Sequence, residues 1–492
     1  MRPTLFFYDL ETSGIRPDSD RIMQFAGQRT DYELKPIGEP INQLIRMTPD
    51  ILPDPLAIMV HGISPQQTID EGISEADFVH VFQTRIVQPN TTFVGFNNLR
   101  FDDEFMRYFN YRNLSDPYEW SYANHNSRWD ILDVVRLTRA LRPEGINWPT
   151  NKDGVGINKL TDLTRANHLP HLSAHDALSD VSATIAVAKL IKQKQPKLYD
   201  YLFNLRQKSA AAKLINSGQP FVHTSWHYPA TQLHTSIVRK VADHPSPNCM
   251  LVFDLRHDPQ PWLNLSIEQL LLAWRFVKNR SADDPPLPVR TIRLNRCPAI
   301  APVGVINSPE VEDRLGLSLA SIQEHNRTLE NAGPEFGLKL VQAVKTLNGE
   351  QGQRQATNLR ESVEQQLYAG FYSERERKLL NGLHQKDHLE TAAGIRELSG
   401  RFEDERLKRL SELYLWRNYS KDLTNDERKA WDQHVRQSLL SGGNNSRLAN
   451  YFRSLNNLSE QGTDRQGAAS FSVLLEDLRL YGESLIPSDM IG

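Results

Sequence analysis

The chain has 492 residues, of which 39% are hydrophobic and 24% charged, with a net charge of −3 at pH 7 and a mean hydropathy of −0.52. This composition excludes a disordered chain, and the length predicts two to four domains. The small negative charge excludes a protein that coats nucleic acid through overall positive charge, so any nucleic-acid site must be local.

The apolar segments are short. The longest runs, such as that from Leu270 to Trp274, fall far below a bilayer span, so neither a transmembrane helix nor a membrane partner is expected. The N-terminal apolar stretch is too brief for a signal-peptide core, which predicts a cytoplasmic protein. Cys249 and Cys297 match no disulfide or metal pattern and are expected to be packed thiols.

Residues 1–195 alternate strand-like and helix-like segments, which predicts an α/β domain. Strands are expected at 5–10, 21–30, 41–47 and 91–96. Helices are expected at 131–141 and 174–192, where apolar residues recur at helical spacing, and Ser173 is the expected N-cap of the second helix.

Residues 196–350 predict a mostly β domain with helical inserts. The clearest strands are at 250–255 and 289–294, and the inserts are expected at 267–279 and 310–315. A polar, glycine-containing joint at 349–353 separates this part from a helical domain over 351–492.

Local signals support helices in the last third. The capping boxes that run from Ser373 to Glu376 and from Thr424 to Glu427 predict two helix starts, and the segment 441–446 predicts a loop between helices. Leu407, Leu410 and Tyr414 are spaced to line one face of a helix.

Asp9 and Glu11 alternate at the end of the first apolar strand. Residues two apart in an extended chain project from the same face, so both carboxylates can bind one hard cation, or two cations that share a bridging carboxylate. By itself such a pair is more often a solvated turn, because exposed acids are common.

Two further clusters each follow an apolar segment and open a helix. One brings Asp102 to a helix N-terminus, and the other places His175 at a helix start with Asp180 one to two turns further along. Taken singly, the acids are explained by the helix dipole and the histidine by capping or packing. Together they supply four carboxylates for two divalent ions, and a histidine able to deprotonate water near neutral pH.

These motifs resemble a known family. Asp9-x-Glu11-Thr12, Asp102 and His175-x4-Asp180 match the three motifs of the DEDDh exonucleases, and the segments 97–104, 126–130 and 140–149 resemble bacterial exonuclease I. The resemblance implies a ribonuclease H-like exonuclease core, a mixed sheet flanked by helices, followed by an SH3-like β-barrel domain and an α-helical C-terminal domain.

The resemblance also implies an activity. It predicts a 3′→5′ exodeoxyribonuclease that degrades single-stranded DNA to 5′-mononucleotides in DNA repair and recombination and acts as a monomer. Asp9, Glu11, Asp102 and Asp180 would hold two Mg2+ ions, for which Mn2+ substitutes, and His175 would be the general base. The family usually has aromatic residues where Leu10 and Ser13 stand, so packing against the terminal base is expected to differ.

Basic and aromatic residues mix downstream of Asp102, as in single-strand binding sites. The candidate DNA contacts are Glu11, Arg107, Tyr118, Tyr122, Arg136, Lys159 and Ala177. The resemblance implies one protein partner, the acidic C-terminal tail of the single-stranded DNA-binding protein, with Arg142 and Tyr201 as the candidate contacts.

Two alternatives stay open. The same chemistry would serve a 3′-5′ exoribonuclease or a structured-end trimmer, although the additional domains disfavour both. A catalytically inactive single-stranded DNA-binding relative would keep the fold, but such a relative commonly loses at least one metal ligand.

Overall fold

The computed structural model describes residues 3–171, 176–275, 277–278, 280–281, 285–358, 362–383, 391–461 and 468–486. Ser173 and His175 therefore lie outside the described residues. Among the helices that are described, each is too short or too polar to cross a bilayer.

The N-terminal part is built on a five-stranded mixed sheet of order β3-β2-β1-β4-β5. Its strands are β1 (Thr4–Thr12), β2 (Ile22–Thr30), β3 (Ile41–Leu44), β4 (Thr91–Gly95) and β5 (Ser127–Asp130). β1 pairs antiparallel with β2 and parallel with β4, and β4 pairs parallel with β5. The carboxyl ends of β1, β4 and β5 therefore share one edge of the sheet, as the alternating pattern predicted.

Helices flank this sheet. They are α1 (Pro55–His61), α2 (Pro65–Glu71), α3 (Glu75–Val81), α4 (Asp102–Arg112), α5 (Ile131–Leu141), α6 (Leu160–Ala166), α7 (Ala177–Lys194), α8 (Pro196–Asn204) and α9 (Lys208–Ile215). The N-cap of α7 differs from the prediction: Asp176, and not Ser173, caps it by accepting from the backbone N–H of Ser179. The described helix consequently begins three residues later than expected.

The second sheet is antiparallel throughout, with the order β10-β6-β7-β8-β9. Its strands are β6 (Phe221–Thr224), β7 (Thr235–Asp243), β8 (Cys249–Asp254), β9 (Val289–Arg293) and β10 (Ala299–Pro302). The helices of this part are α10 (Gln260–Leu263), α11 (Ile267–Trp274), α12 (Pro309–Leu315) and α13 (Leu319–Asn331). The two helical inserts were predicted, whereas α10 and α13 were missed.

The expected joint at 349–353 was wrong. A single helix, α14 (Glu335–Asn358), runs through that segment without a break. A glycine inside a helix costs only about 1 kcal/mol relative to alanine, so Gly349 and Gly352 do not suffice to end it. The domain boundary near residue 350 stays a prediction, but it falls within a helix.

The last part is helical. Its helices are α15 (Glu374–Leu383), α16 (Ala392–Arg401), α17 (Glu405–Asn418), α18 (Asn425–Leu440), α19 (Arg447–Gln461) and α20 (Ala468–Ser484). The capping box at Thr424 is complete. At Ser373 only half of the box forms, because the Glu376 carboxylate accepts instead from the backbone N–H groups of Glu403 and Asp404.

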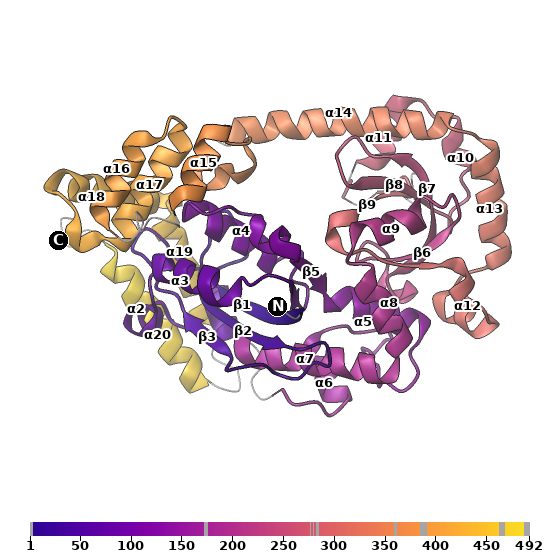
Figure 1. The fold of residues 1–492 in the computed structure, drawn as a ribbon, viewed down its shortest axis with the longest axis horizontal. Coiled ribbons are helices and arrows are strands. Elements are labelled where there is room, and N and C mark those ends of the chain that lie inside the picture. Colours follow the sequence, from indigo (N-terminus) through magenta and orange to yellow (C-terminus); the bar gives the residue numbers. More distant parts are fainter. Residues whose placement is uncertain are drawn as a thin grey trace.

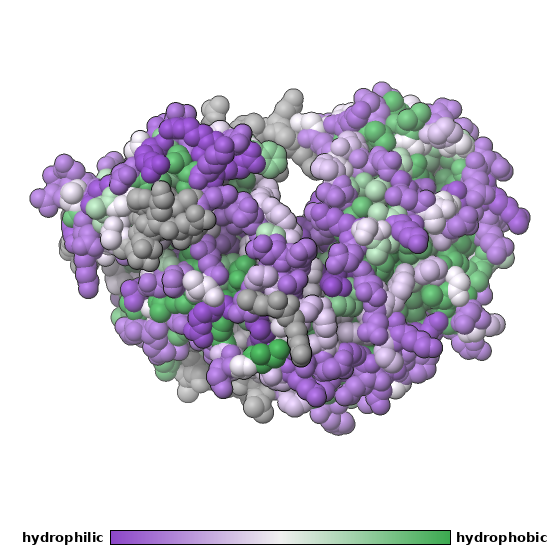
Figure 2. Space-filling view, viewed as in Figure 1, coloured by the Kyte–Doolittle hydropathy of each residue, from purple (hydrophilic) through white to green (hydrophobic). Residues whose placement is uncertain are grey.

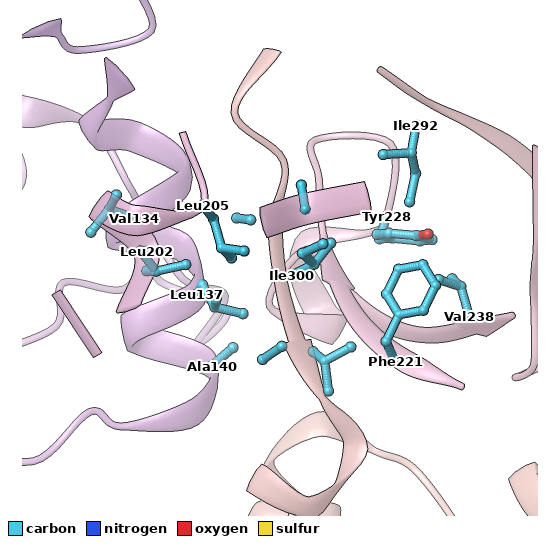
Figure 3. Packing of buried hydrophobic residues seen from close by; sticks show 14 of the residues in the cluster. Val134, Leu137, Ala140, Leu202, Leu205, Phe221, Tyr228, Val238, Ile292 and Ile300 are labelled. Atoms are coloured by element: carbon cyan, nitrogen blue, oxygen red, sulfur yellow. The ribbon is translucent and has the colours of Figure 1, made fainter. Parts of the chain in front are cut away.

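The two sheets are joined by one apolar core (Figure 3). From the first part, Leu137 on α5 and Leu202 on α8 face the second sheet, which contributes Phe221 and Ile300. All four side chains are almost completely buried. This continuous core fixes the second sheet beside the carboxyl end of the first.

The C-terminal helices pack on the other side of the first sheet. One cluster joins Met23 and Ile58 to Leu455 and Leu478 of α19 and α20, and another places Tyr111 of α4 among the side chains of α16 and α17. Helix α14 crosses between the helical part and the second sheet (Figure 1), and Figure 2 shows an opening below this helix, rimmed largely by hydrophilic residues.

Candidate active site

The end of β1 presents two acids at the edge of the sheet. Asp9 lies opposite Ala26 and Glu11 opposite Gln24 in the antiparallel pairing with β2, so both project from the same face. Leu10 points to the opposite face, where it is 5% exposed within a cluster that includes Phe25. At its end, β1 therefore presents Asp9 and Glu11 on one face and Leu10 to the apolar cluster on the other.

Helix α4 brings a third acid to the same place. The chain turns after β4 at Asn97, which has a positive φ of 71° and whose N–H donates to the Asp130 carboxylate at 2.9 Å. The helix then begins at Asp102, which is 4% exposed and lies near the backbone of Leu10, the residue between the two acids of β1.

Helix α7 supplies the fourth acid from its first turn. Oxygen atoms of Asp9, Glu11 and Asp180 all lie within 4.8 Å of one another. The structure thus brings three of the predicted carboxylates into one group, with Asp102 beside them.

Burial and mutual repulsion perturb these acids. Burial, followed by the charges of Asp180 and Asp102, raises the pKa of Glu11 to about 8. Burial, with the charge of Asp102 next, raises the pKa of Asp9 well above its usual value. Asp102 itself has a pKa raised to about 8, again by burial first. Among the described residues, no arginine or lysine bonds to Asp9, Glu11 or Asp102, and an oxygen-only donor set suits a hard divalent cation.

The histidine bound to this cluster is one that the sequence analysis missed. His171 Nε2 lies 2.6 Å from Asp180 Oδ1, and its Nδ1 lies 3.0 Å from Thr164 Oγ1 on α6. The predicted base, His175, lies outside the described residues, so its place stays a prediction. In the sequence, His171 is marked only by its position nine residues before Asp180, and this spacing matches no helical or strand repeat that would have identified it.

The two departures from the family pattern prove to be interior positions. Leu10 is buried in the core, and Ser13 is fully buried, with its Oγ accepting from the N–H of Arg21. Neither side chain has surface available to a terminal base, and the expected change in packing stays a prediction.

Some predicted contacts gather in a cleft of about 950 Å³, and one of its lining residues, Arg128, pairs with Asp103, the neighbour of Asp102 in sequence. Arg107, Tyr118 and Tyr122 line it, and the Arg107 guanidinium lies 5.5 Å from the centre of the Tyr118 ring. Arg293 and Arg296 extend the lining from the second sheet. The mixture of basic and aromatic side chains is that of a single-strand groove.

The other predicted contacts lie elsewhere. Arg136 bonds the Asp133 carboxylate at 2.8 Å, and Lys159 is exposed at the N-cap of α6. Ala177 is fully buried in the main core, and a contact between it and DNA stays a prediction. Arg142 donates to the carbonyl of Val305 at 3.3 Å, and Tyr201 packs partly buried against the main core.

The mixed sheet, its carboxylate cluster and the adjoining basic cleft define a metal-dependent nuclease of the ribonuclease H-like class. Family models match three consecutive segments: Exonuclease over 6–188, Exonuclease I SH3-like domain over 206–346 and Exonuclease I C-terminal domain over 361–485.

Relatives agree over the whole length. The chain is 37% identical to exodeoxyribonuclease I of Escherichia coli (strain K12), with 98% of each chain covered. A crystal structure of E. coli exonuclease I with a dA16 oligonucleotide matches with a TM-score of 0.89 at 36% identity, and an ExoI/SSB-Ct complex with a TM-score of 0.88 at 35% identity. Each comparison covers 99% of this chain and 100% of the other.

The chain belongs to the exonuclease I family. It has a ribonuclease H-like exonuclease domain, an SH3-like domain and the family's C-terminal domain, as the sequence predicted. The exonuclease family and the acidic cluster together imply dependence on a divalent metal.

Proposed function

We propose that this chain hydrolyses single-stranded DNA from its 3′ end, releases 5′-mononucleotides and serves DNA repair and recombination. The observation that carries the proposal is the convergence of Asp9, Glu11 and Asp180 on one point, with Asp102 beside them, in a domain that also holds a basic and aromatic cleft. We expect the enzyme to act in the cytoplasm as a monomer.

The acids fit a pair of Mg2+ ions, for which Mn2+ would substitute. Asp9, Glu11, Asp102 and Asp180 would hold them, since four carboxylates offer enough oxygen ligands and balance the positive charge. When bound, the ions would polarise the scissile phosphate and stabilise charge on the attacking and leaving oxygens.

His175 is the proposed general base. It lies five residues before Asp180 and two before the start of α7, so a helix start would orient it toward the acids. His175→Ala should lower the rate of nucleotide release by about 10²–10⁴-fold, the usual effect of losing a general base. His171→Ala is the informative comparison. A loss of nucleotide release in His171→Ala alone would assign the general base to His171 instead.

The cleft is the proposed path of the strand. Arg107 would bind phosphate, and Tyr118 and Tyr122, the latter 62% exposed, would stack on bases. Glu11 would contact the terminal nucleotide as well as metal. Contacts from Arg136 and Lys159 stay predictions.

A protein partner follows from the solved ExoI/SSB-Ct complex, which is similar to this chain along its length. We propose that this chain also binds the acidic C-terminal tail of the single-stranded DNA-binding protein, through Arg142 and Tyr201. The Arg142 guanidinium donates to the backbone carbonyls of Leu141 and Val305, and a carboxylate would be a stronger acceptor than either carbonyl. Arg142→Ala should weaken binding of a tail peptide and leave hydrolysis of a free oligonucleotide unchanged.

The substrate is tested directly by incubating the protein and Mg2+ with single-stranded DNA and RNA of matched sequence, each labelled at the 5′ end. We expect DNA to shorten from the 3′ end while RNA persists. Equal or faster loss of RNA would favour an exoribonuclease, and binding without cleavage would favour an inactive DNA-binding relative.

A further inference from the structure

One acid stands in the basic cleft and joins the three parts of the molecule. The Glu104 carboxylate accepts from Arg107 at 2.5 Å, from Arg296 at 2.8 Å and from the Tyr368 hydroxyl at 2.7 Å. Arg107 belongs to the exonuclease domain, Arg296 lies between strands β9 and β10 of the second sheet, and Tyr368 precedes helices α15 to α20. The three donors therefore meet on one side chain.

The charge of the cleft makes this acid unusual. Six cations line the cleft: Arg107, Arg128, Arg206, Lys208, Arg293 and Arg296. Glu104 is the one acid among the described residues that line it. Arg128 forms an ion pair with Asp103, but this acid is fully buried and does not line the cleft. Glu104 is thus the acid that meets cations within the cleft itself.

The position of Glu104 leaves its partners accessible. Its side chain is 17% exposed and that of Arg296 is 29% exposed, so a ligand in the cleft can reach the ion pairs. A carboxylate and a backbone phosphate accept from arginine in the same way, through charge-assisted hydrogen bonds. A phosphate entering the cleft would consequently compete with Glu104 for the same two guanidinium groups.

We propose that Glu104 is a built-in competitor for DNA phosphate: it holds Arg107 and Arg296 in the cleft until a phosphate of the strand takes its place. The inference rests on the proposed function, in which this cleft binds single-stranded DNA. It has two consequences. The arginines are ordered before the strand arrives, and the strand is bound less tightly than the cations alone would bind it, so that it can advance after each cleavage.

The test is Glu104→Gln, which removes the charge and keeps the shape. Affinity for a fluorescent dT16 oligonucleotide is measured in EDTA, so that no cleavage occurs, over a series of salt concentrations. We expect binding to tighten by about tenfold, as for removal of one charge that opposes the ligand. The slope of log affinity against log salt should steepen by about 0.7, the value for one further phosphate neutralised in a single strand.

Two controls separate competition from a general charge effect. Glu119→Gln removes an exposed acid beside Tyr118 that lies outside the cleft lining, and it should change the affinity less than about twofold. Tyr368→Phe removes the third donor without changing charge, and it should leave the salt slope unchanged. Equal tightening by Glu119→Gln, or unchanged or weaker binding by Glu104→Gln, would overturn the proposal.

A double-mutant cycle covers the case in which Glu104→Gln disturbs folding, which thermal unfolding will reveal. In the parent chain, Arg296→Gln should weaken binding by about threefold. In a chain that carries Glu104→Asp, whose shorter side chain loosens the ion pair with Arg296, the same substitution should weaken binding by about tenfold. Equal effects in both backgrounds would overturn the proposal. If the parent chain degrades DNA while these results fail, only the competitor role falls. If the parent neither binds nor degrades DNA, the proposed function falls with it.

Discussion

Two groups of buried acids in this molecule behave in opposite ways. At the edge of the first sheet, Glu11 and Asp102 have a pKa raised to about 8 by burial and by neighbouring carboxylates. Between the first sheet and the C-terminal helices, Asp50 and Glu364 are also buried, and burial by itself would raise the pKa of each. The charge of Arg417 nevertheless holds the pKa of Asp50 well below its usual value, and the charges of Arg21 and then Arg417 do the same for Glu364.

The difference lies in the partners. Arg417 donates to Asp50 at 2.6 Å and to Glu364 at 2.9 Å, and Arg21 donates to Glu364 at 2.9 Å as well. The interdomain acids are thus paired with arginines, whereas among the described residues no arginine or lysine bonds to Asp9, Glu11 or Asp102 at the edge of the sheet. Burial alone therefore does not set the pKa of an acid, because the charges of its partners decide the direction of the shift.

The largest expected effect is the loss of a ligand from the uncompensated cluster. Asp180→Ala should lower nucleotide release by more than about 10³-fold, since metal ions supply several kcal/mol of charge stabilisation. Strand binding in EDTA should persist. Asp162→Ala, a surface acid on α6 paired with Arg165, is the matched control and should retain full activity. Unchanged release by Asp180→Ala would remove Asp180 from the metal site.

The compensated cluster should respond in stability. Arg417→Ala leaves Asp50 and Glu364 buried with less positive charge, and it should lower the free energy of unfolding by about 3–5 kcal/mol, measured by urea denaturation. Arg409→Ala on the same helix breaks an exposed pair with Glu412 and should cost less than about 1 kcal/mol. Equal effects of the two substitutions would show that the buried network is not what joins the domains.

The two groups should also differ in their pH dependence. For Glu11 and Asp102 the folded pKa exceeds the unfolded one, so in EDTA their contribution to stability is present at pH 4 and is lost as the pH rises to about 8. Metal competes with these protons. The increase in melting temperature caused by Mg2+ should therefore be larger at pH 8.5 than at pH 6, as followed by calorimetry. An increase that is independent of pH would contradict the proposed ligands.

For Asp50 and Glu364 the sign is reversed. Their folded pKa values are lowered, so the stability that they contribute is present above pH 4 to 5 and is lost only as the pH falls below it. This loss should be insensitive to Mg2+, which provides an internal reference for the calorimetric experiment.

The smallest effect expected is a gain. Asp102→Asn removes one charge from the cluster and should stabilise the metal-free protein at pH 8 by about 0.5–2 kcal/mol, as is common where function has been favoured over stability. Asp50→Asn should instead destabilise it, because Arg417 loses a charged partner. A loss of stability by Asp102→Asn in EDTA would mean that repulsion within the cluster is negligible.

Local chemistry made part of this structure predictable. The alternation of Asp9 and Glu11 on a strand, the helix start at Asp102 and the position of Asp180 near the beginning of the next acidic helix depend on residues close in sequence, and the structure places them as expected. The strand-like segments at 250–255 and 289–294 likewise indicated the second sheet.

Other features depend on contacts that no local pattern contains. Arg21 and Glu364 are 343 residues apart, and Glu104 meets donors from three domains. Helix α14 passes through Gly349 and Gly352 because packing at its N-terminal half against α11 and β7 outweighs their small propensity cost. Ser and Asp are both good N-caps, so the residue types alone do not identify Asp176 as the cap of α7.

Helix α14 also sets a rule for how this architecture can change. Its 24 residues span about 36 Å, and each residue advances the axis by about 1.5 Å while turning it by about 100°. A deletion of a single residue would consequently swing one lobe out of alignment with the other. The orientation of the second sheet relative to the helical part is kept only by insertions or deletions close to a whole number of turns. Among relatives we therefore expect the length of α14 to vary in steps of about seven residues, which is two turns.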